Sequence, residues 1–428
     1  MLKKKLASIT TLAIVVSLAT SIFTGCGNKN SATSGQPKNE TGKTTIEFWT
    51  ISLRPTFDDF FNDKIKNYEQ KNQNVKINWT DLPIDAIQNK LITATAGGTS
   101  PDVVNLNTPM ALTLGGKGAL VDLNKEASAE QKDVYISTLF QSTKLKDSIY
   151  AFPWYGAPSV CMYNKDLFEK AGLQNPPKTF EEMLSMAKQM KEKTGAYLYI
   201  PEQFSKILFL EGIKLVSDDK TKAAFNTDEA IGLMEKYKKA VDEGSLPKTN
   251  WGAWDAMLQQ FSTGKLAMIN SGAQTIKRIK DEAPNIYKTM EVTTPIVGKS
   301  NLVMNPLMNV VVPAKSKNHK EAIAFAHFIT NDENQLAFSK TVQIFPSTKK
   351  AAEDPFFRSD TNSIEGKALA IAADELKIST DLSIGHEKEA EVFDTINKVA
   401  EAVLLSGKDI KTALTEAETK VNSILSSK

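Results

Sequence analysis

Apolar and polar positions follow two different rhythms between residues 45 and 106. Short strand-like runs occupy Thr45–Trp49, Val75–Trp79 and Asp102–Leu106. The segments between them carry apolar residues three and four positions apart, the spacing of a helix with one buried face: Phe57, Phe60, Phe61, Ile65 and Tyr68, then Ile84, Ile87, Leu91 and Ala94 before Gly97-Gly98. Strand, helix, strand, helix, strand predicts βαβ units and a parallel sheet, hence an α/β fold.

Helical patterning returns in the rest of the chain. Thr179 precedes an apolar run and Glu182 follows three residues later, the signature of a capped helix start that leads to a helix as far as Lys193. Further helices are predicted over residues 228–242, 254–263, 320–330 and 390–405. At roughly 100–200 residues per domain, the 428-residue chain has room for two or three domains.

The N-terminus has the pattern of a secretory signal. Lys3–Lys5 form a cationic start, Leu6–Phe23 is apolar, and the small residues Thr24-Gly25 precede Cys26. A transmembrane anchor is the alternative, but Ser and Thr residues dilute the run below the roughly 20 apolar residues a span needs. Phe23–Cys26 resembles the bacterial lipobox, which implies removal of residues 1–25 and lipidation of Cys26. Residues 26–44 lack large apolar side chains and are expected to form a flexible tether.

Composition narrows the possible functions. The chain has 52 basic and 50 acidic residues, and removal of Lys3–Lys5 with the signal leaves 49 against 50. Such a balance argues against nucleic-acid binding, which needs a basic surface. Two Cys and three scattered His do not suit a zinc site, and we expect no metal and no cofactor. Cys161, in the apolar run Val160–Met162, is expected to be a buried thiol.

Aromatic and neutral polar residues follow the predicted strands. Ligands of open parallel sheets bind beyond the carboxyl ends of the strands. Trp49 and Ser52, Asn107 and Thr108, and the pair Trp154-Tyr155 stand at such positions, with Arg54 as the nearby charge. Such a lining favours a neutral, hydroxyl-rich ligand over a phosphate or a metal.

Catalytic motifs do not account for these residues. The sequence has no GxSxG, GxxxxGK[ST], HExxH or helix-opening GxGxxG. Two carboxylates that would serve a glycoside hydrolase cannot be told from solvated ones by sequence, so a secreted hydrolase remains an alternative.

Several phrases occur in a recurrent order along the chain: Ile46–Trp49, Ala96–Val104, Gly118–Leu123, Tyr150–Pro153, Met162–Phe168 with Ala171–Leu173, Pro176–Phe180, Gly264–Met268, Pro346-Ser347 and Ser406–Lys408. In these the chain resembles the extracellular solute-binding protein family 1, the maltose-binding-protein-like lipoprotein receptors of sugar-importing ABC transporters. The resemblance extends over essentially everything after residue 45.

The resemblance implies a two-lobed periplasmic-binding-protein-like fold. Each lobe would be a mostly parallel sheet flanked by helices, with the ligand cleft at the hinge. The first lobe would contain residues 45–156 plus about 310–355, and the second residues 157–309 plus about 356–428. The chain would cross between the lobes near 156–158, 305–308 and 356–362.

The resemblance also implies a set of ligand contacts. The expected residues are Trp49, Ser52, Arg54, Asn107, Thr108, Trp154, Tyr155, Trp251, Trp254, Ser271, Gly272, Gln274, Asn305 and Met308. Gln274 departs from the family pattern, in which many relatives have Trp two residues after the Gly.

Each of these side chains also has a purely structural interpretation. A Trp at the end of a strand or the start of a helix can equally belong to the core, and Trp79, on an alternating strand, is expected to do so. Arg54 can be a surface ion-pair partner, and Glu202 can lie in a solvated loop instead of reaching the cleft.

The implied function is capture of a carbohydrate, an oligosaccharide or similar polyol, by hinge closure and its delivery to an ABC permease, without chemistry of its own. The expected partners are the sugar, the permease subunits and the membrane that holds the lipid on Cys26, and the receptor is expected to be a monomer on the extracytoplasmic face. A receptor for a non-sugar solute such as glycerol-3-phosphate is the other alternative, although Arg54 is the one candidate donor for a phosphate.

Overall fold

The computed structural model describes residues 42–427. The predicted signal segment 1–25, Cys26 and most of the tether 26–44 lie outside the described residues. Thr44, which the sequence assigned to the tether, already belongs to the first strand.

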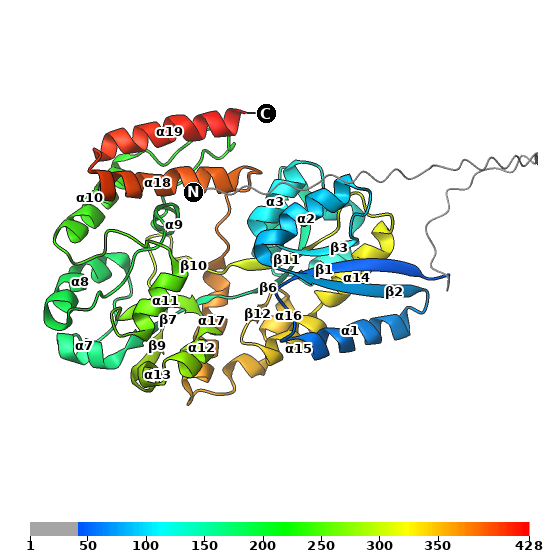
Figure 1. The fold of residues 1–428 in the computed structure, drawn as a ribbon, viewed down its shortest axis with the longest axis horizontal. Coiled ribbons are helices and arrows are strands. Elements are labelled where there is room, and N and C mark those ends of the chain that lie inside the picture. Colours follow the sequence, from blue (N-terminus) through cyan, green and yellow to red (C-terminus); the bar gives the residue numbers. More distant parts are fainter. Residues whose placement is uncertain (1–41, 428) are drawn as a thin grey trace, which may run out of the picture. The chain divides into compact units, whose positions relative to one another are not determined.

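A six-stranded sheet combines four strands from the first part of the described chain with two later strands (Figure 1). Its strand order is β12-β6-β11-β3-β1-β2, with β1 parallel to both β2 and β3 and with β11 antiparallel to β3 and β6. The three parallel strands are those predicted from the pattern. The strands are β1 (Thr44–Ile51), β2 (Val75–Leu82), β3 (Val103–Asn107), β6 (Ala151–Gly156), β11 (Leu307–Val311) and β12 (Phe345–Pro346).

Neighbouring residues of a strand point to opposite sides of the sheet. Both sides of this sheet carry apolar residues, so helices cover both faces. Val103 and Phe152 pack with α1, α14 and α15, whereas Val104 and Ala151 pack with α2 and α3. Figure 1 shows α2 and α3 on one side of the strands and α1 and α15 on the other. The helices of this lobe are α1 (Asp58–Lys71), α2 (Ile84–Ala96), α3 (Thr108–Gly116), α4 (Leu123–Glu126), α5 (Ala129–Asp133), α6 (Ser137–Phe140), α14 (His319–Ile329), α15 (Asp332–Thr341) and α16 (Lys349–Ala352), with the 3-10 turn η1 (Gln141–Thr143) and the hairpin β4 (Lys144–Leu145)–β5 (Ser148–Ile149).

The second sheet corrects the expectation of a mostly parallel arrangement. Its three strands, β7 (Ser159–Asn164), β8 (Met268–Gly272) and β9 (Met290–Thr293), lie in the order β8-β7-β9, and both pairs are antiparallel. A run of apolar residues predicts a strand but not its direction in the sheet. That direction depends on the path of the connection before the strand.

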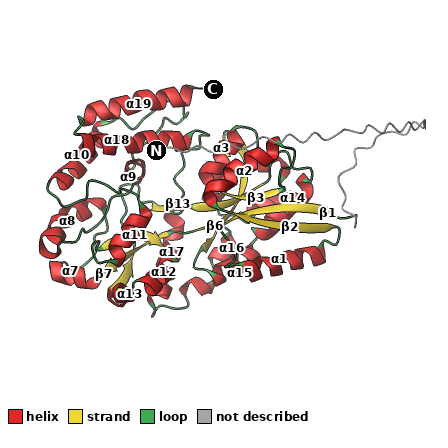
Figure 2. Cartoon of the chain, in the orientation of Figure 1, coloured by secondary structure: helices red, strands yellow, loops and turns green. Residues whose placement is uncertain are grey.

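Two helical layers enclose this sheet as well (Figure 2). Cys161 faces the layer that includes α8, α10 and α18, and Met162 faces the layer of α11, α12 and α17. The elements are α7 (Lys165–Ala171), α8 (Phe180–Thr194), α9 (Phe204–Leu210), α10 (Asp228–Asp242), α11 (Trp254–Ser262), α12 (Thr275–Glu282), α13 (Pro284–Thr289), α17 (Ile364–Glu375), α18 (Glu389–Ser406) and α19 (Ile410–Ser426), with the 3-10 turns η2 (Pro355–Arg358) and η3 (Leu376–Ile378). Among residues 42–427, no helix combines the length and apolarity needed to cross a membrane.

Short connections join the two sheets. The chain passes from β6 to β7 over two residues. The strand β10 (Val303–Met304) lies just before β11 in sequence and pairs in parallel with the much later strand β13 (Ser379–Thr380). Gly156 ends β6 against Asn305, and a Cβ at Gly156 would collide with the Asn305 amide. A glycine is therefore required where these two connections meet.

Candidate functional site

A cavity of about 270 Å³, here called the Trp254 cavity, opens on the second lobe beside the connections. Its lining comes from α9, α11, the end of β8 and the segment before β11. Four residues predicted from the sequence line it together: Trp254, Ser271, Gly272 and Gln274.

Trp254 is held in place although its side chain is exposed. It is the first residue of α11 and is 39% exposed, unusually so for so large an apolar group. Its indole Nε1 donates a hydrogen bond to Ser271 Oγ at 3.1 Å, and Ser271 Oγ lies 2.7 Å from Thr275 Oγ1. The guanidinium carbon of Arg278 lies 5.5 Å from the ring centroid. An anchored, exposed ring of this kind can stack on a ligand with little loss of side-chain entropy.

The charged groups of the Trp254 cavity neutralise each other. Glu202, weighed above as a loop residue, lines the cavity and pairs with Lys206 one helical turn on, at 3.4 Å. The Tyr199 hydroxyl also donates to Glu202, at 3.3 Å. Asn270 adds a neutral amide to the lining. The cavity thus offers hydrogen-bonding groups without a net charge.

The residues just after β1 form a polar group beyond the carboxyl end of that strand. Ser52 is exposed with φ of 51°, and Arg54 is exposed with its guanidinium carbon 4.0 Å from the Trp79 ring centroid. Arg54 also pairs with Asp58, Nε to Oδ1, at 3.6 Å. Trp49 is half-buried and packs against the core. Trp79 is buried, as predicted, and donates to Thr50 Oγ1 at 2.8 Å.

Asn107 and Thr108 serve the start of α3. Asn107 Oδ1 caps the helix by accepting the Met110 N–H at 3.0 Å, and the buried Thr108 hydroxyl accepts from Asn309 Nδ2 at 3.0 Å. Thr108 is also hydrogen-bonded to Asp381, whose carboxylate accepts the Leu307 N–H at 3.3 Å. Burial raises the pKa of Asp381 to about 6, against these hydrogen bonds and the nearby Lys206 charge, which lower it. Asp381 therefore joins the start of α3 to the start of β11.

Trp154 does not line the Trp254 cavity. Its side chain is 1% exposed and fills the core, with ring centroids of Phe61 and Phe338 at 5.7 and 5.8 Å. This corrects the expectation that Trp154 presents an aromatic face to the ligand. Its neighbour Tyr155 is half-buried, and burial, together with the Asp81 charge, raises the pKa of its phenol, which stays protonated and able to donate.

Three further predicted residues lie outside the Trp254 cavity. Trp251 donates its indole N–H to the Pro247 carbonyl at 2.9 Å, stands edge-on to Tyr237 and borders a different cavity. Asn305 is buried and donates to Ser379 Oγ at 3.1 Å, so it fastens the connection instead of facing a ligand. Met308 is half-buried on β11.

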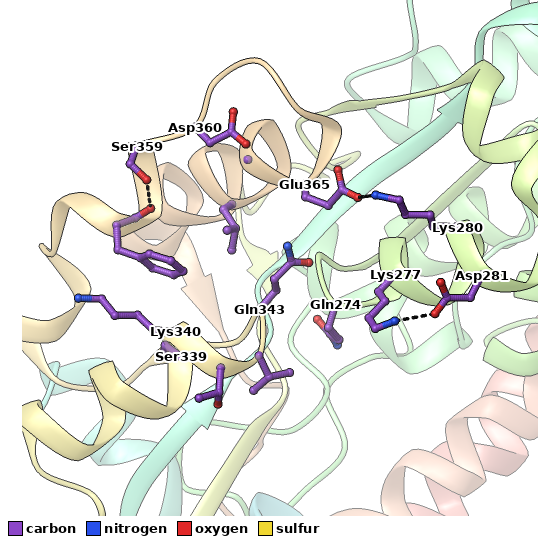
Figure 3. A pocket seen from close by; sticks show the side chains of 15 residues that line it. Gln274, Lys277, Lys280, Asp281, Ser339, Lys340, Gln343, Ser359, Asp360 and Glu365 are labelled. Atoms are coloured by element: carbon purple, nitrogen blue, oxygen red, sulfur yellow. Dashed lines mark hydrogen bonds and ion pairs between the residues drawn. The ribbon is translucent and has the colours of Figure 1, made fainter. Parts of the chain in front are cut away.

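A larger cavity of about 640 Å³, here called the Phe356 cavity, adjoins the first at Gln274, which lines both. Its other walls come from α12, the end of α15, η2 and the start of α17. Figure 3 shows its lining, including the ion pairs Lys277–Asp281 and Lys280–Glu365, at 2.6 and 3.0 Å. The lining holds three lysines and three carboxylates.

Neither a metal-binding cluster nor a reactive thiol is found among the described residues. Within residues 42–427 no group of three or more His, Cys, Asp or Glu is placed to hold a metal ion. Cys161 is buried, as predicted, and burial raises the pKa of its thiol, so it stays protonated and unreactive at neutral pH.

The two lobes and their connections match a known family. The family model described as bacterial extracellular solute-binding protein matches residues 64–364, more than half of the chain. The chain belongs to this family. This solute-binding protein has a two-lobed fold: it superposes on the cyclic alpha-maltosyl-1,6-maltose binding protein from Arthrobacter globiformis with a TM-score of 0.78 at 20% identity, over 90% of this chain and 99% of that one.

Two curated relatives extend the comparison. The solute-binding protein is 28% identical to the diacetylchitobiose binding protein DasA of Streptomyces coelicolor, over 87% of this chain and 86% of the relative. It is 24% identical to a maltooligosaccharide ABC transporter solute-binding lipoprotein of Streptococcus pneumoniae, over 78% and 79% respectively. These relatives are binding proteins.

Sequence reasoning missed part of the site. Lys206 and Asn270 carry no motif, and they line the Trp254 cavity together because α9 and the end of β8 meet there. The one available signal was for Lys206, which lies four residues after Glu202, the spacing of an ion pair on a helix.

Proposed function

We propose that this solute-binding protein captures a carbohydrate, an oligosaccharide or similar polyol, and delivers it to an ABC permease without changing it chemically. The anchored and exposed Trp254 ring carries the proposal. Sugar rings present flat C–H faces that stack on such a ring, while their hydroxyls need neutral polar partners.

The polar lining supports the same ligand class. The paired charges of Glu202 and Lys206, beside the amides of Asn270 and Gln274, suit hydroxyl groups. A phosphate would need several free cationic donors, and Arg54, the candidate donor, already pairs with Asp58. The carbohydrate-binding relatives point in the same direction.

Binding is proposed to act through hinge closure. We place the lobe boundaries near residues 156, 309 and 356, with Trp49, Ser52, Arg54, Asn107, Tyr155 and Met308 as contacts from the first lobe. Thr108, which the sequence also suggested, is left out because it is fully buried. A ligand stabilises the closed form to the extent that it contacts both lobes better than one.

The membrane attachment belongs to the proposal as well. Lipidation of Cys26 after removal of residues 1–25 would hold a monomeric receptor on the extracytoplasmic face, with residues 27–43 as its tether. Metabolic labelling with a fatty-acid probe should label the wild type, and Cys26→Ser should abolish the label. Fatty-acid labelling of the Cys26→Ser variant would contradict attachment through Cys26.

A thermal-shift screen against a carbohydrate panel tests the function. A ligand at 100 times its dissociation constant adds about 2.7 kcal/mol to the free energy of unfolding and raises the melting temperature. Stabilisation by glycerol-3-phosphate that is lost in Arg54→Ala, with no response to any sugar, would favour the alternative receptor.

A further inference from the structure

The Trp254 cavity is small for the ligands that the proposed function names. Ligand pockets usually enclose about 300–1,000 Å³, and this cavity encloses about 270 Å³. An oligosaccharide therefore needs more room than the Trp254 cavity provides.

The adjoining Phe356 cavity supplies that room. It encloses about 640 Å³ and meets the Trp254 cavity at Gln274. The Gln274 side chain is exposed and lies against Gly272, where an added Cβ would collide with the Gln274 amide. The border between the cavities is thus a flexible amide with donors and an acceptor, which can hydrogen-bond a chain that passes over it.

The lining of the Phe356 cavity has the same character as that of the first. Phe356 contributes a half-buried ring, with Lys340 Nζ 5.7 Å from its centroid. Gln343 and Ser359 add neutral polar groups, drawn in Figure 3. Because three lysines and three carboxylates line it, the cavity has no net formal charge that would select an anion.

We propose that the Phe356 cavity is a second carbohydrate subsite, so that the ligand is a chain of three or more sugar units. One end stacks on Trp254, the chain passes Gln274, and an outer unit lies against the Phe356 ring. This inference rests on the proposed function, since it assigns the length of the ligand.

Calorimetric titration with chitooligosaccharides and maltooligosaccharides of two to five units tests the subsite. For the series that binds, affinity of the wild type should increase about tenfold or more between two and four units. Phe356→Ala should lose about 5–50-fold for four and five units and leave two units unchanged, whereas Trp254→Ala should weaken every length.

Two controls keep the result decisive. Phe393→Ala, at a half-buried ring on α18 that lines neither cavity, should leave every affinity unchanged. Phe356→Leu removes the stacking face but keeps apolar contact with Phe357, in case Phe356→Ala does not fold. Equal affinity for two and four units, or an equal loss at every length in the Phe356 variants, would overturn the subsite alone. Failure of every sugar to bind would overturn the proposed function.

Discussion

Two tryptophans in the same segment illustrate how much depends on single side chains. Trp251 and Trp254 lie three residues apart, and the sequence gives both the same expected role. The structure separates them: the Trp251 indole N–H bonds to the backbone and its ring packs on Tyr237, while the Trp254 ring is exposed at a cavity.

Trp254→Ala should lower sugar affinity by about 1–3 kcal/mol, roughly 5–150-fold, with little change in melting temperature. Trp251→Ala is the matched variant, and it should lower the melting temperature while sparing affinity in the protein that remains folded. Calorimetric titration and thermal melting of both variants measure this. Unchanged affinity in Trp254→Ala would mean that the ligand does not use this cavity.

A buried carboxyl group makes the stability dependent on pH. Glu389 is fully buried at the start of α18, and burial raises its pKa to about 8, although Ser383 Oγ and the Ile384 N–H donate to its Oε2 at 2.9 and 3.1 Å. The folded protein therefore keeps a proton that the unfolded chain releases near pH 4.5. This contribution to stability is complete below that pH and is lost as the pH rises towards 8.

Glu389→Gln should flatten this dependence, because one such carboxyl contributes up to about 1.4 kcal/mol per pH unit. Thermal melting between pH 5 and pH 9 measures the difference from wild type. Glu401→Gln, at an exposed position of the same helix, is the control. Parallel melting curves for wild type and Glu389→Gln would show that the carboxyl is not buried in this way.

Element boundaries follow from local chemistry, and α8 shows this at its start. Thr179 Oγ1 accepts the Glu182 N–H at 3.2 Å, and the Glu182 carboxylate accepts the Lys178 N–H at 2.7 Å. The sequence pattern predicted this start. The predicted range 228–242 likewise coincides with α10. Helix spacing and caps depend on residues a few positions apart, so a sequence carries them.

Thr179→Ala should lower the free energy of unfolding by about 1 kcal/mol, because the Glu182 N–H loses its partner. Urea denaturation checks this, with Thr179→Ser as the variant that keeps the hydroxyl and should cost less. If the alanine and serine variants were equally stable, the cap would contribute nothing to α8.

Pairing between distant segments could not be predicted in the same way. The antiparallel pairing of β8 and β9 with β7, and the joining of β6, β11 and β12 to the first sheet, depend on connections that no local pattern describes. The same limit applies to the site. Ser271, Gly272 and Gln274 could be predicted because they follow one phrase in sequence, whereas Lys206 lines the same cavity from the remote helix α9.

For the whole molecule, the fold is two-lobed and the chain belongs to the bacterial extracellular solute-binding family. The linings of both cavities have no net formal charge, and an anchored aromatic ring borders the Trp254 cavity. We propose that such a protein binds a carbohydrate and releases it chemically unchanged.

Isothermal titration of the purified protein with a panel of oligosaccharides, followed by chromatography of the recovered sugar, tests this claim most directly. We expect saturable binding of at least one oligosaccharide with one site per chain, and recovery of that sugar intact after prolonged incubation. Consumption of the sugar, or no binding by any member of the panel, would contradict the account.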